Sequence, residues 1–207
     1  MGAAALSETW LQRFAAAVVS RPFFYDLVQK AAGQQKVAER MRAMASGLPR
    51  QRVLDVGSSS GGLAGSIGLR PICLDLDPRP LVRLRQRAGG HPSRAVAGDA
   101  ARLPFPAAAF DLTLCAMVFH HLDDDTVRLV VEELSRVTAG RLLFLEPLRN
   151  ERRRVSRILW RYDRGRHPRS RAELLALLGG AFELVDVREF AVYHEYVACV
   201  ASPLGRA

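Results

Sequence analysis

The chain has 207 residues, 49% of them hydrophobic, and this size and composition favour one globular domain with a sizeable core. Its formal net charge is +9, and the excess is concentrated between residues 149 and 171, where ten arginines stand against one glutamate and one aspartate. No apolar run approaches the roughly 18 residues of a membrane-spanning helix, and the N-terminal stretch lacks the layout of a signal peptide, so we expect a cytoplasmic protein.

The first part of the chain, residues 1–49, is predicted to be helical. Apolar side chains recur there at helical spacing in three stretches, which include Trp10, Tyr25 and Val37. Gly47 follows the last of these stretches and is expected to end it. We expect the helices to form an N-terminal cap that belongs to the same domain as residues 50–207.

Short apolar runs alternate with helical stretches through the rest of the chain. The expected strands are Val53 to Val56, Pro71 to Leu74, Arg94 to Ala97, Phe110 to Cys115, Arg141 to Leu145, Phe182 to Val187 and Tyr196 to Ala201. The clearest helix runs from Thr126 to Thr138 and is preceded by three aspartates that favour a helix N-terminus. A shorter helix is expected from Ala172 to Leu178. This alternation predicts an α/β fold with a doubly wound, mostly parallel seven-stranded sheet.

The stretch VLDVGSSSGG, from Val53 to Gly62, is predicted to be a buried strand that breaks into a turn of small residues. Gly57 stands where the backbone is expected to need a positive φ. The serines that follow leave backbone N–H groups uncovered, and the glycines after them let the chain enter a helix near Leu63. Such a turn favours a nucleotide-like ligand, but it is also an ordinary packing solution in α/β folds.

Acidic residues follow the first three expected strands. Asp55 and Asp75 end the first and second, and Asp99 comes after the third. Because ligands of open α/β sheets bind beyond the carboxyl ends of the strands, these carboxylates are candidate ligand contacts. Asp75 comes eighteen residues after Gly57, where a carboxylate can accept hydrogen bonds from both hydroxyls of a ribose. That spacing alone also suits NAD, and each aspartate can instead cap the turn or helix that follows it.

Four motifs in order, between about residues 50 and 147, resemble those of the class I S-adenosylmethionine-dependent methyltransferases, especially the small-molecule subgroup that includes ubiquinone and menaquinone biosynthesis enzymes. VLDVGSSSGG is similar to their glycine-rich first motif, LDLDP to the acidic end of the second strand, and GDAARLPFPAAAFD to the adenine-binding turn with the strand after it. The next two motifs of the family are matched by FHHL, followed by EELSRV and RLLFLEP. The resemblance implies a Rossmann-like methyltransferase fold with S-adenosyl-L-methionine as cofactor.

The resemblance also implies which residues contact the cofactor. The methionine end would lie on the turn after the first strand, the ribose on Asp75, and the adenine beside Leu76, Asp99 and Ala100. Tyr25 would close over the cofactor carboxylate. The full predicted set is Tyr25, Asp55, Gly57, Ser58, Ser59, Gly61, Asp75, Leu76, Asp99, Ala100 and Cys115.

Two residues of the turn depart from the family pattern. Ser58 stands in place of a frequent cysteine, and Ser59 stands in place of the middle glycine. A positive φ at Ser59 would strain the backbone by roughly 1 to 3 kcal/mol. Both side chains are small, so we expect cofactor binding to survive. The alternative is a non-catalytic binding protein that retains the fold with a degenerate cofactor turn.

His120 and His121 end the fourth strand and are the candidate catalytic residues. A neutral imidazole near pH 7 can take a proton from the methyl acceptor. A base is needed only where the accepting atom carries a proton, because the cofactor is already activated and positioning can supply much of the catalysis. Each histidine can instead pack or bond to the backbone.

No metal site and no disulfide is predicted. The aspartates after His121 are better explained as the start of a helix than as metal ligands, and the histidines lack ligands at helical spacing. Cys73, Cys115 and Cys199 are widely spaced in apolar runs, which predicts buried free thiols.

The basic insert, residues 148–171, is predicted to contain an amphipathic helix with arginines around its apolar face. Three interpretations stay open. It can be a solvated lid, it can receive an anionic substrate, a carrier protein or a membrane surface, or it can bind RNA phosphate. RNA ranks last, because the chain shows neither a separate RNA-binding domain nor an interleaved aromatic platform.

The expected reaction is O-, N- or C-methylation of a small-molecule acceptor. The sequence after the fourth strand reads CAMVFHHL, where the resemblance associates Asn/Asp-Pro-Pro-Tyr/Phe with methylation of amino groups on adenine or glutamine. We therefore expect a partly apolar acceptor, such as a quinone-like, polyketide or other secondary metabolite. An RNA methyltransferase and a non-catalytic binding protein are the alternatives. The oligomeric state is not predicted.

Overall fold

The computed structural model describes residues 33–87, 95–149, 167–192 and 194–205. Their elements in chain order are α3 (Gln34–Met44), β1 (Val53–Val56), α4 (Gly62–Ser66), β2 (Ile72–Asp75), α5 (Pro78–Arg87), β3 (Ala95–Ala97), β4 (Phe110–Ala116), the 3-10 turn η1 (Phe119–His121), α6 (Asp124–Val137), β5 (Thr138–Pro147), α8 (Arg171–Gly179), β6 (Phe182–Ala191) and β7 (Glu195–Pro203). The helices predicted before residue 33 and the helix predicted within 150–166 lie outside the described residues. Within the described ranges, no helix is long and apolar enough to cross a membrane.

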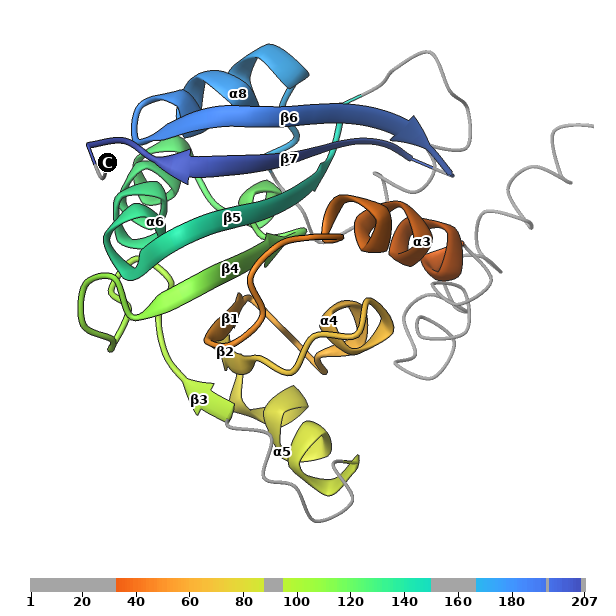
Figure 1. Cartoon of the computed structure of the whole chain (residues 1–207), viewed down its shortest axis with the longest axis vertical. Coiled ribbons are helices and arrows are strands. Elements are labelled where there is room, and N and C mark those ends of the chain that lie inside the picture. The colour runs from red at the N-terminus through yellow and green to blue at the C-terminus, as the bar shows by residue number, and fades with distance from the viewer. Residues whose placement is uncertain (1–32, 88–94, 150–166, 193, 206–207) are drawn as a thin grey trace, which may run out of the picture.

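The described strands form one sheet in the order β3-β2-β1-β4-β5-β7-β6 (Figure 1). The five strands from β3 to β5 pair in parallel, whereas β7 is antiparallel to both of its neighbours. The order reverses at β1, from which the chain proceeds outward first toward β3 and then toward β6. This confirms the predicted doubly wound, mostly parallel seven-stranded sheet.

Apolar cores lie on both faces of the sheet. On one face, α6 and α8 pack through residues such as Leu134 and Leu178. On the other, α3 and α4 pack through residues that include Met41 and Ile67. Central strands are therefore covered on both sides, which explains why β1 is buried at every position and reads as an almost continuous apolar run.

Several strands are longer than the sequence predicted, and β5 and β6 are extended the most. β5 begins at Thr138, directly after α6, where its hydroxyl lies 2.7 Å from that of Thr113 and donates to the Leu134 carbonyl at 2.6 Å. β6 continues through Arg188 and Glu189 to Ala191. Because β6 is an edge strand with an exposed side, it accepts charged residues that interrupt an apolar pattern.

Both helices on the β5 side begin with a side-chain cap. Asp123 accepts a hydrogen bond from the backbone N–H of Thr126 at 2.8 Å, so α6 starts two residues before the predicted Thr126. Ser170 and Glu173 form a reciprocal capping box at the start of α8. These caps place the ends of both helices beside the carboxyl end of the sheet.

Candidate cofactor-binding and active site

The turn between β1 and α4 folds over the end of β2. The N–H of Gly57 donates to the Leu74 carbonyl at 2.8 Å, and the N–H of Ser59 donates to Asp75 Oδ2 at 2.7 Å. Gly57 has φ 69° and Ser59 has φ 48°. The positive φ predicted at Gly57 is therefore confirmed, and Ser59 adopts the left-handed backbone that strains a residue with a side chain.

At two glycines of this turn, an added side chain would meet a neighbouring side chain and would have to adopt a positive φ. A β-carbon on Gly57 would lie 2.3 Å from Val118 Cγ2, and one on Gly61, which has φ 68°, would lie 2.9 Å from Leu84 Cδ1. The absence of a side chain at Gly57 thus lets the segment after β4 approach the turn after β1. The predicted cofactor turn and the predicted histidines consequently belong to one site.

Asp55 and Ser58 are buried polar residues at the floor of this turn. Asp55 is 4% exposed. Burial, and secondarily the charge of Asp75, raises the pKa of Asp55 to about 8. The Ser58 hydroxyl is buried as well, and it has no hydrogen-bond partner in the described structure. Both groups are expected to need a polar ligand.

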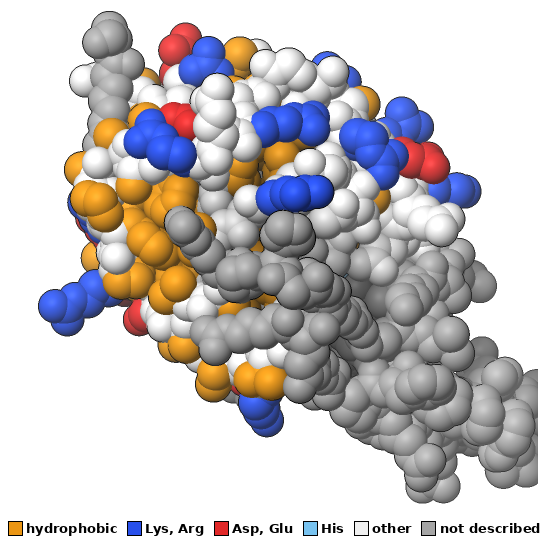
Figure 2. All heavy atoms as spheres, turned by 60° about the horizontal axis from the view of Figure 1, so that its bottom comes forward, with side chains coloured by type: hydrophobic (Ala, Val, Ile, Leu, Met, Phe, Trp, Pro, Cys, Tyr) orange, Lys and Arg blue, Asp and Glu red, His pale blue; other side chains and the backbone are white. Residues whose placement is uncertain are grey.

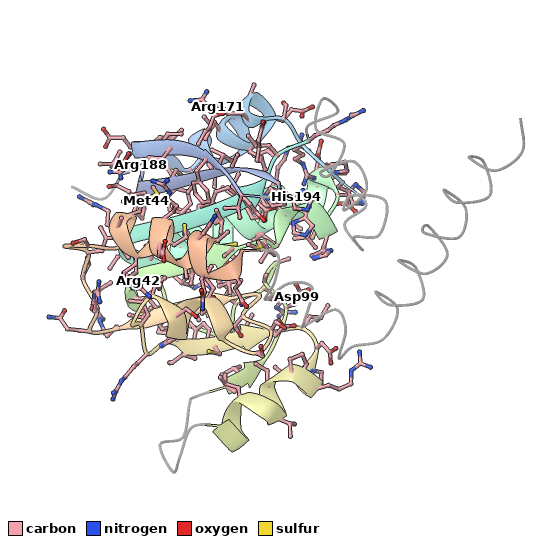
Figure 3. All side chains as sticks on the ribbon, turned by 90° about the vertical axis from the view of Figure 1, so that its right-hand side faces the viewer. Arg42, Met44, Asp99, Arg171, Arg188 and His194 are labelled. Atoms are coloured by element: carbon pink, nitrogen blue, oxygen red, sulfur yellow. The ribbon has the colours of Figure 1, made fainter. Side chains whose placement is uncertain are left out.

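The carboxylates after β2 and β3 lie at neighbouring strand ends. The N–H of Gly98 donates to the backbone carbonyl of Asp75 at 3.0 Å, and Asp99 Oδ1 accepts the N–H of Ala101 at 2.9 Å. The side chain of Leu76, next to Asp75, is 75% exposed. Figure 3 looks onto the carboxyl ends of the parallel strands and shows Asp99 on this side of the molecule. An apolar side chain and two carboxylates therefore stand together where a nucleoside is expected.

The turn that carries Asp99 and Ala100 is held onto α6 by an ion pair. Glu133 and Arg136 lie 2.6 Å apart, and hydrogen bonding to Arg136 lowers the pKa of Glu133. Glu133 accepts the N–H of Leu103 at 2.6 Å, and Arg136 donates to the Leu103 carbonyl at 3.0 Å. The pair thereby holds the two peptide groups that flank the Leu103 α-carbon. Sequence reasoning missed this role, although both residues lie within the quoted EELSRV motif.

A buried histidine–glutamate pair occupies the ends of β4 and β5. His120 Nδ1 lies 2.7 Å from Glu146 Oε2, and the two residues are 5% and 1% exposed. Glu146 Oε1 also accepts the N–H groups of Val118 and Phe119. His121 is exposed, and its ring centroid lies 4.0 Å from that of His120. Of the two predicted histidines, His120 is thus held by a buried carboxylate.

Glu146 is a site residue that the sequence prediction omitted. It stands near the end of an apolar strand, as Asp55 does in β1. The same signal that singled out Asp55 was therefore present in RLLFLEP, and it was overlooked because the predicted strand ended at Leu145.

Two further predicted contacts are Cys115 and Tyr25. Cys115 is fully buried, and burial raises its pKa well above the usual thiol value. Its contact with the cofactor stays a prediction. Tyr25 lies outside the described residues.

All three cysteines are free and buried, as predicted. The described ranges contain no group of three or more side chains able to hold a metal ion.

The site therefore joins a glycine-rich turn, strand-end aspartates and a histidine–glutamate pair at the carboxyl ends of parallel strands. Together with the sheet order, these features define the Rossmann-like fold of the class I S-adenosylmethionine-dependent methyltransferases. Over part of its length, the chain is similar to proteins of that class.

Comparisons with known proteins agree with this assignment. A family model for a methyltransferase domain matches residues 54–144. The chain is 35% identical over 119 residues to malonyl-[acyl-carrier protein] O-methyltransferase of Serratia marcescens, a match that covers 55% of this chain and 45% of that protein. It is 38% identical over 105 residues to demethylmenaquinone methyltransferase of Deinococcus radiodurans, covering 46% and 43%. The matched segments therefore span less than half of either relative.

A solved structure shares the fold over nearly the whole chain. It is 1,6-didemethyltoxoflavin-N1-methyltransferase from Burkholderia thailandensis, with bound 1,6-didemethyltoxoflavin and S-adenosylhomocysteine. The TM-score is 0.66 at 20% identity, and the match covers 98% of this chain and 91% of that one.

Proposed function

We propose that the protein transfers a methyl group from S-adenosylmethionine to a small-molecule acceptor. The observation that carries this proposal is a pair of buried polar residues, Asp55 and Ser58, beneath the turn with positive φ at Gly57, where the Ser58 hydroxyl has no hydrogen-bond partner in the described structure. The matching methyltransferase domain model and the names of the two curated relatives support it.

The residues present fit this cofactor. Its methionine end carries an ammonium and a carboxylate, which Asp55 and the N–H groups of the turn can bind. Asp75 offers carboxylate oxygens to the ribose hydroxyls, and the exposed Leu76 offers apolar surface to the adenine. When bound, the cofactor supplies a methyl group that is already activated for transfer.

His120 is the base that we propose for this reaction. Its contact with Glu146 assigns the proton of the neutral ring to Nδ1, so the basic lone pair lies on Nε2. The Glu146 carboxylate stabilises the imidazolium that forms when the ring takes a proton. A base of this kind favours an acceptor atom that carries a proton, as in O- or N-methylation.

The proposed acceptor is a small, partly apolar molecule. It can also be anionic or attached to a carrier protein. The names of the two relatives, one acting on a malonyl carrier protein and one on demethylmenaquinone, support both kinds of acceptor. A contact of the basic insert with a membrane surface and a cytoplasmic location stay predictions from the sequence.

An RNA acceptor is less well supported. On the face seen in Figure 2, the described lysine and arginine side chains are interspersed with hydrophobic, acidic and other surface. Several described arginines are paired with acidic residues, such as Arg52 with Asp111 and Arg188 with Asp186. Phosphate binding needs clustered positive charge.

Isothermal titration calorimetry with S-adenosylhomocysteine tests the proposed function. We expect saturable binding by the full chain, with NAD as a matched control that does not bind. Failure to bind S-adenosylhomocysteine at millimolar concentration would contradict the proposal and favour the non-catalytic alternative.

A further inference from the structure

Arg169 is a buried arginine whose guanidinium contacts the turn that carries His120. It is 5% exposed. Nη1 donates to the Phe119 carbonyl at 2.6 Å, and Nη2 donates to the Leu122 carbonyl at 2.7 Å. Nε and Nη2 also lie 2.9 and 2.6 Å from Asp124 Oδ1. One side chain therefore holds both ends of η1 and the first turn of α6.

The backbone on either side of residues 150–166 is tied to the same turn. The N–H of His167 donates to the His120 carbonyl at 3.0 Å, and the N–H of Arg149 donates to the Arg169 carbonyl at 2.9 Å. The chain before and after residues 150–166 thus meets at Arg169. Sequence reasoning counted Arg169 among the arginines of the insert and gave it no separate role.

Glu146 completes the support from the opposite side. It accepts backbone N–H groups at the start of η1, whereas Arg169 donates to carbonyls at both ends. A 3-10 turn of three residues makes few hydrogen bonds of its own, so its position depends on outside partners. The orientation of His120 is consequently set by two oppositely charged buried side chains.

The pair between Arg169 and Asp124 does not by itself explain why the guanidinium is buried. The Asp124 side chain is 63% exposed, so water screens this ion pair. The carbonyl contacts are buried or partly buried, and a planar guanidinium can serve several acceptors at fixed angles. The contacts that require an arginine are therefore those to the turn.

We propose that Arg169 is a positioning residue that holds His120 in the orientation needed for proton transfer. This proposal rests on the proposed function, in which His120 is the base that takes the proton of the methyl acceptor. Lysine carries the same charge but cannot reach the two carbonyls and Asp124 at once, so it is expected to restore the orientation only in part.

The test compares Arg169→Gln and Arg169→Lys with Arg171→Gln in the full chain. Arg171 lies two residues away at the surface of the molecule (Figure 3), where it forms an exposed pair with Glu189 at 2.6 Å. Nitrogen-15 NMR of the histidine rings reports the tautomer of His120 and its titration. Calorimetry with S-adenosylhomocysteine reports whether the cofactor site is intact.

In Arg169→Gln, we expect the Nδ1 and Nε2 signals of His120 to move toward the average of a two-tautomer mixture. Arg169→Lys should give a smaller movement, and Arg171→Gln none. The affinity for S-adenosylhomocysteine should stay within about twofold of wild type in all three variants, because the β1 turn is untouched. If Arg169→Gln does not fold, the test is the comparison of Arg169→Lys with wild type and Arg171→Gln.

Wild-type His120 signals in a folded Arg169 variant would overturn the proposal, as would an equal movement in Arg171→Gln. Failure of the wild-type protein to bind S-adenosylhomocysteine would instead contradict the proposed function. The two failures are therefore distinguishable.

Discussion

Glu146 Oε2 lies 2.7 Å from His120 Nδ1 and so joins two residues that are 26 positions apart in the chain. The contact exists because β4 and β5 are parallel neighbours whose carboxyl ends meet at one edge of the sheet. The same carboxylate accepts the N–H of Phe119 at 2.7 Å, so it orients the ring and the backbone together. A buried acceptor of this kind fixes one tautomer of the imidazole.

Glu146→Gln should lower turnover by at least about tenfold, because the amide keeps acceptor geometry but cannot stabilise the imidazolium of His120. The measurement is transfer of labelled methyl from S-adenosylmethionine to candidate acceptors. Affinity for S-adenosylhomocysteine should stay unchanged. The matched control is Glu132→Gln, at an exposed glutamate of α6, which should retain turnover. Wild-type turnover in Glu146→Gln would contradict the assigned role.

Asp75→Ala should raise the dissociation constant for S-adenosylhomocysteine by roughly 10- to 100-fold, because hydrogen bonds to a charged carboxylate contribute about 1.5 to 3 kcal/mol. Calorimetry measures the change. Asp77→Ala is the control, since this nearby exposed carboxylate pairs with Arg79 at 2.7 Å and does not face the ribose in the proposed mode. Equal affinity of Asp75→Ala and wild type for S-adenosylhomocysteine would contradict the proposed contact between Asp75 and the ribose.

Asp55 should make stability fall as the pH rises. Its pKa in the folded protein is about 8, above the value of about 4 expected in an unfolded chain, so the folded state holds the proton more tightly. This stabilisation is complete below pH ~4, declines by up to about 1.4 kcal/mol per pH unit, and is lost above pH ~8.

Asp55→Asn removes this titration, so urea unfolding between pH 5 and pH 9 should show a weaker pH dependence of the free energy in the variant than in wild type. The comparison cancels the contributions of surface groups that both proteins share. The same pH dependence in both proteins would show that Asp55 is not the group responsible.

Ser59→Gly should raise the free energy of unfolding by about 1 kcal/mol, because Ser59 has φ 48° and glycine adopts this backbone without strain. Chemical denaturation measures the change. Ser60→Gly is the control, since Ser60 is not among the described residues with positive φ and should gain nothing. A loss of stability in Ser59→Gly would mean that the turn is not strained.

Arg136→Gln should weaken S-adenosylhomocysteine binding several-fold and lower the free energy of unfolding by about 1 kcal/mol, because the turn that carries Asp99 loses two hydrogen bonds to its carbonyls. The control is Arg128→Gln on the same helix. Arg128 pairs at 2.7 Å with Asp125, but both side chains are largely exposed, so we expect a change within about 0.5 kcal/mol. Equal effects of the two substitutions would argue against the role of Arg136.

Local patterns were sufficient to predict the elements and their order. Apolar runs such as Val53 to Val56 and the valine face of α6 depend on spacing along the chain, and caps such as Asp123 depend on residues three positions away. The positive φ at Gly57 was predictable for the same reason. The strain at Ser59 was predictable as well, because a serine stands there in place of the middle glycine of the family pattern.

Only the tertiary structure decided which residues that are far apart in sequence contact each other. Arg169 and Phe119 are 50 positions apart, and nothing local in a run of arginines distinguishes the one that is buried. Cys115 is likewise buried completely by the layers that pack on the sheet. The sequence alone therefore determined which segments are helix or strand, because those choices depend on near neighbours. The folded sheet determined which charges lie beside His120, because only strand order and packing bring distant residues within hydrogen-bonding distance.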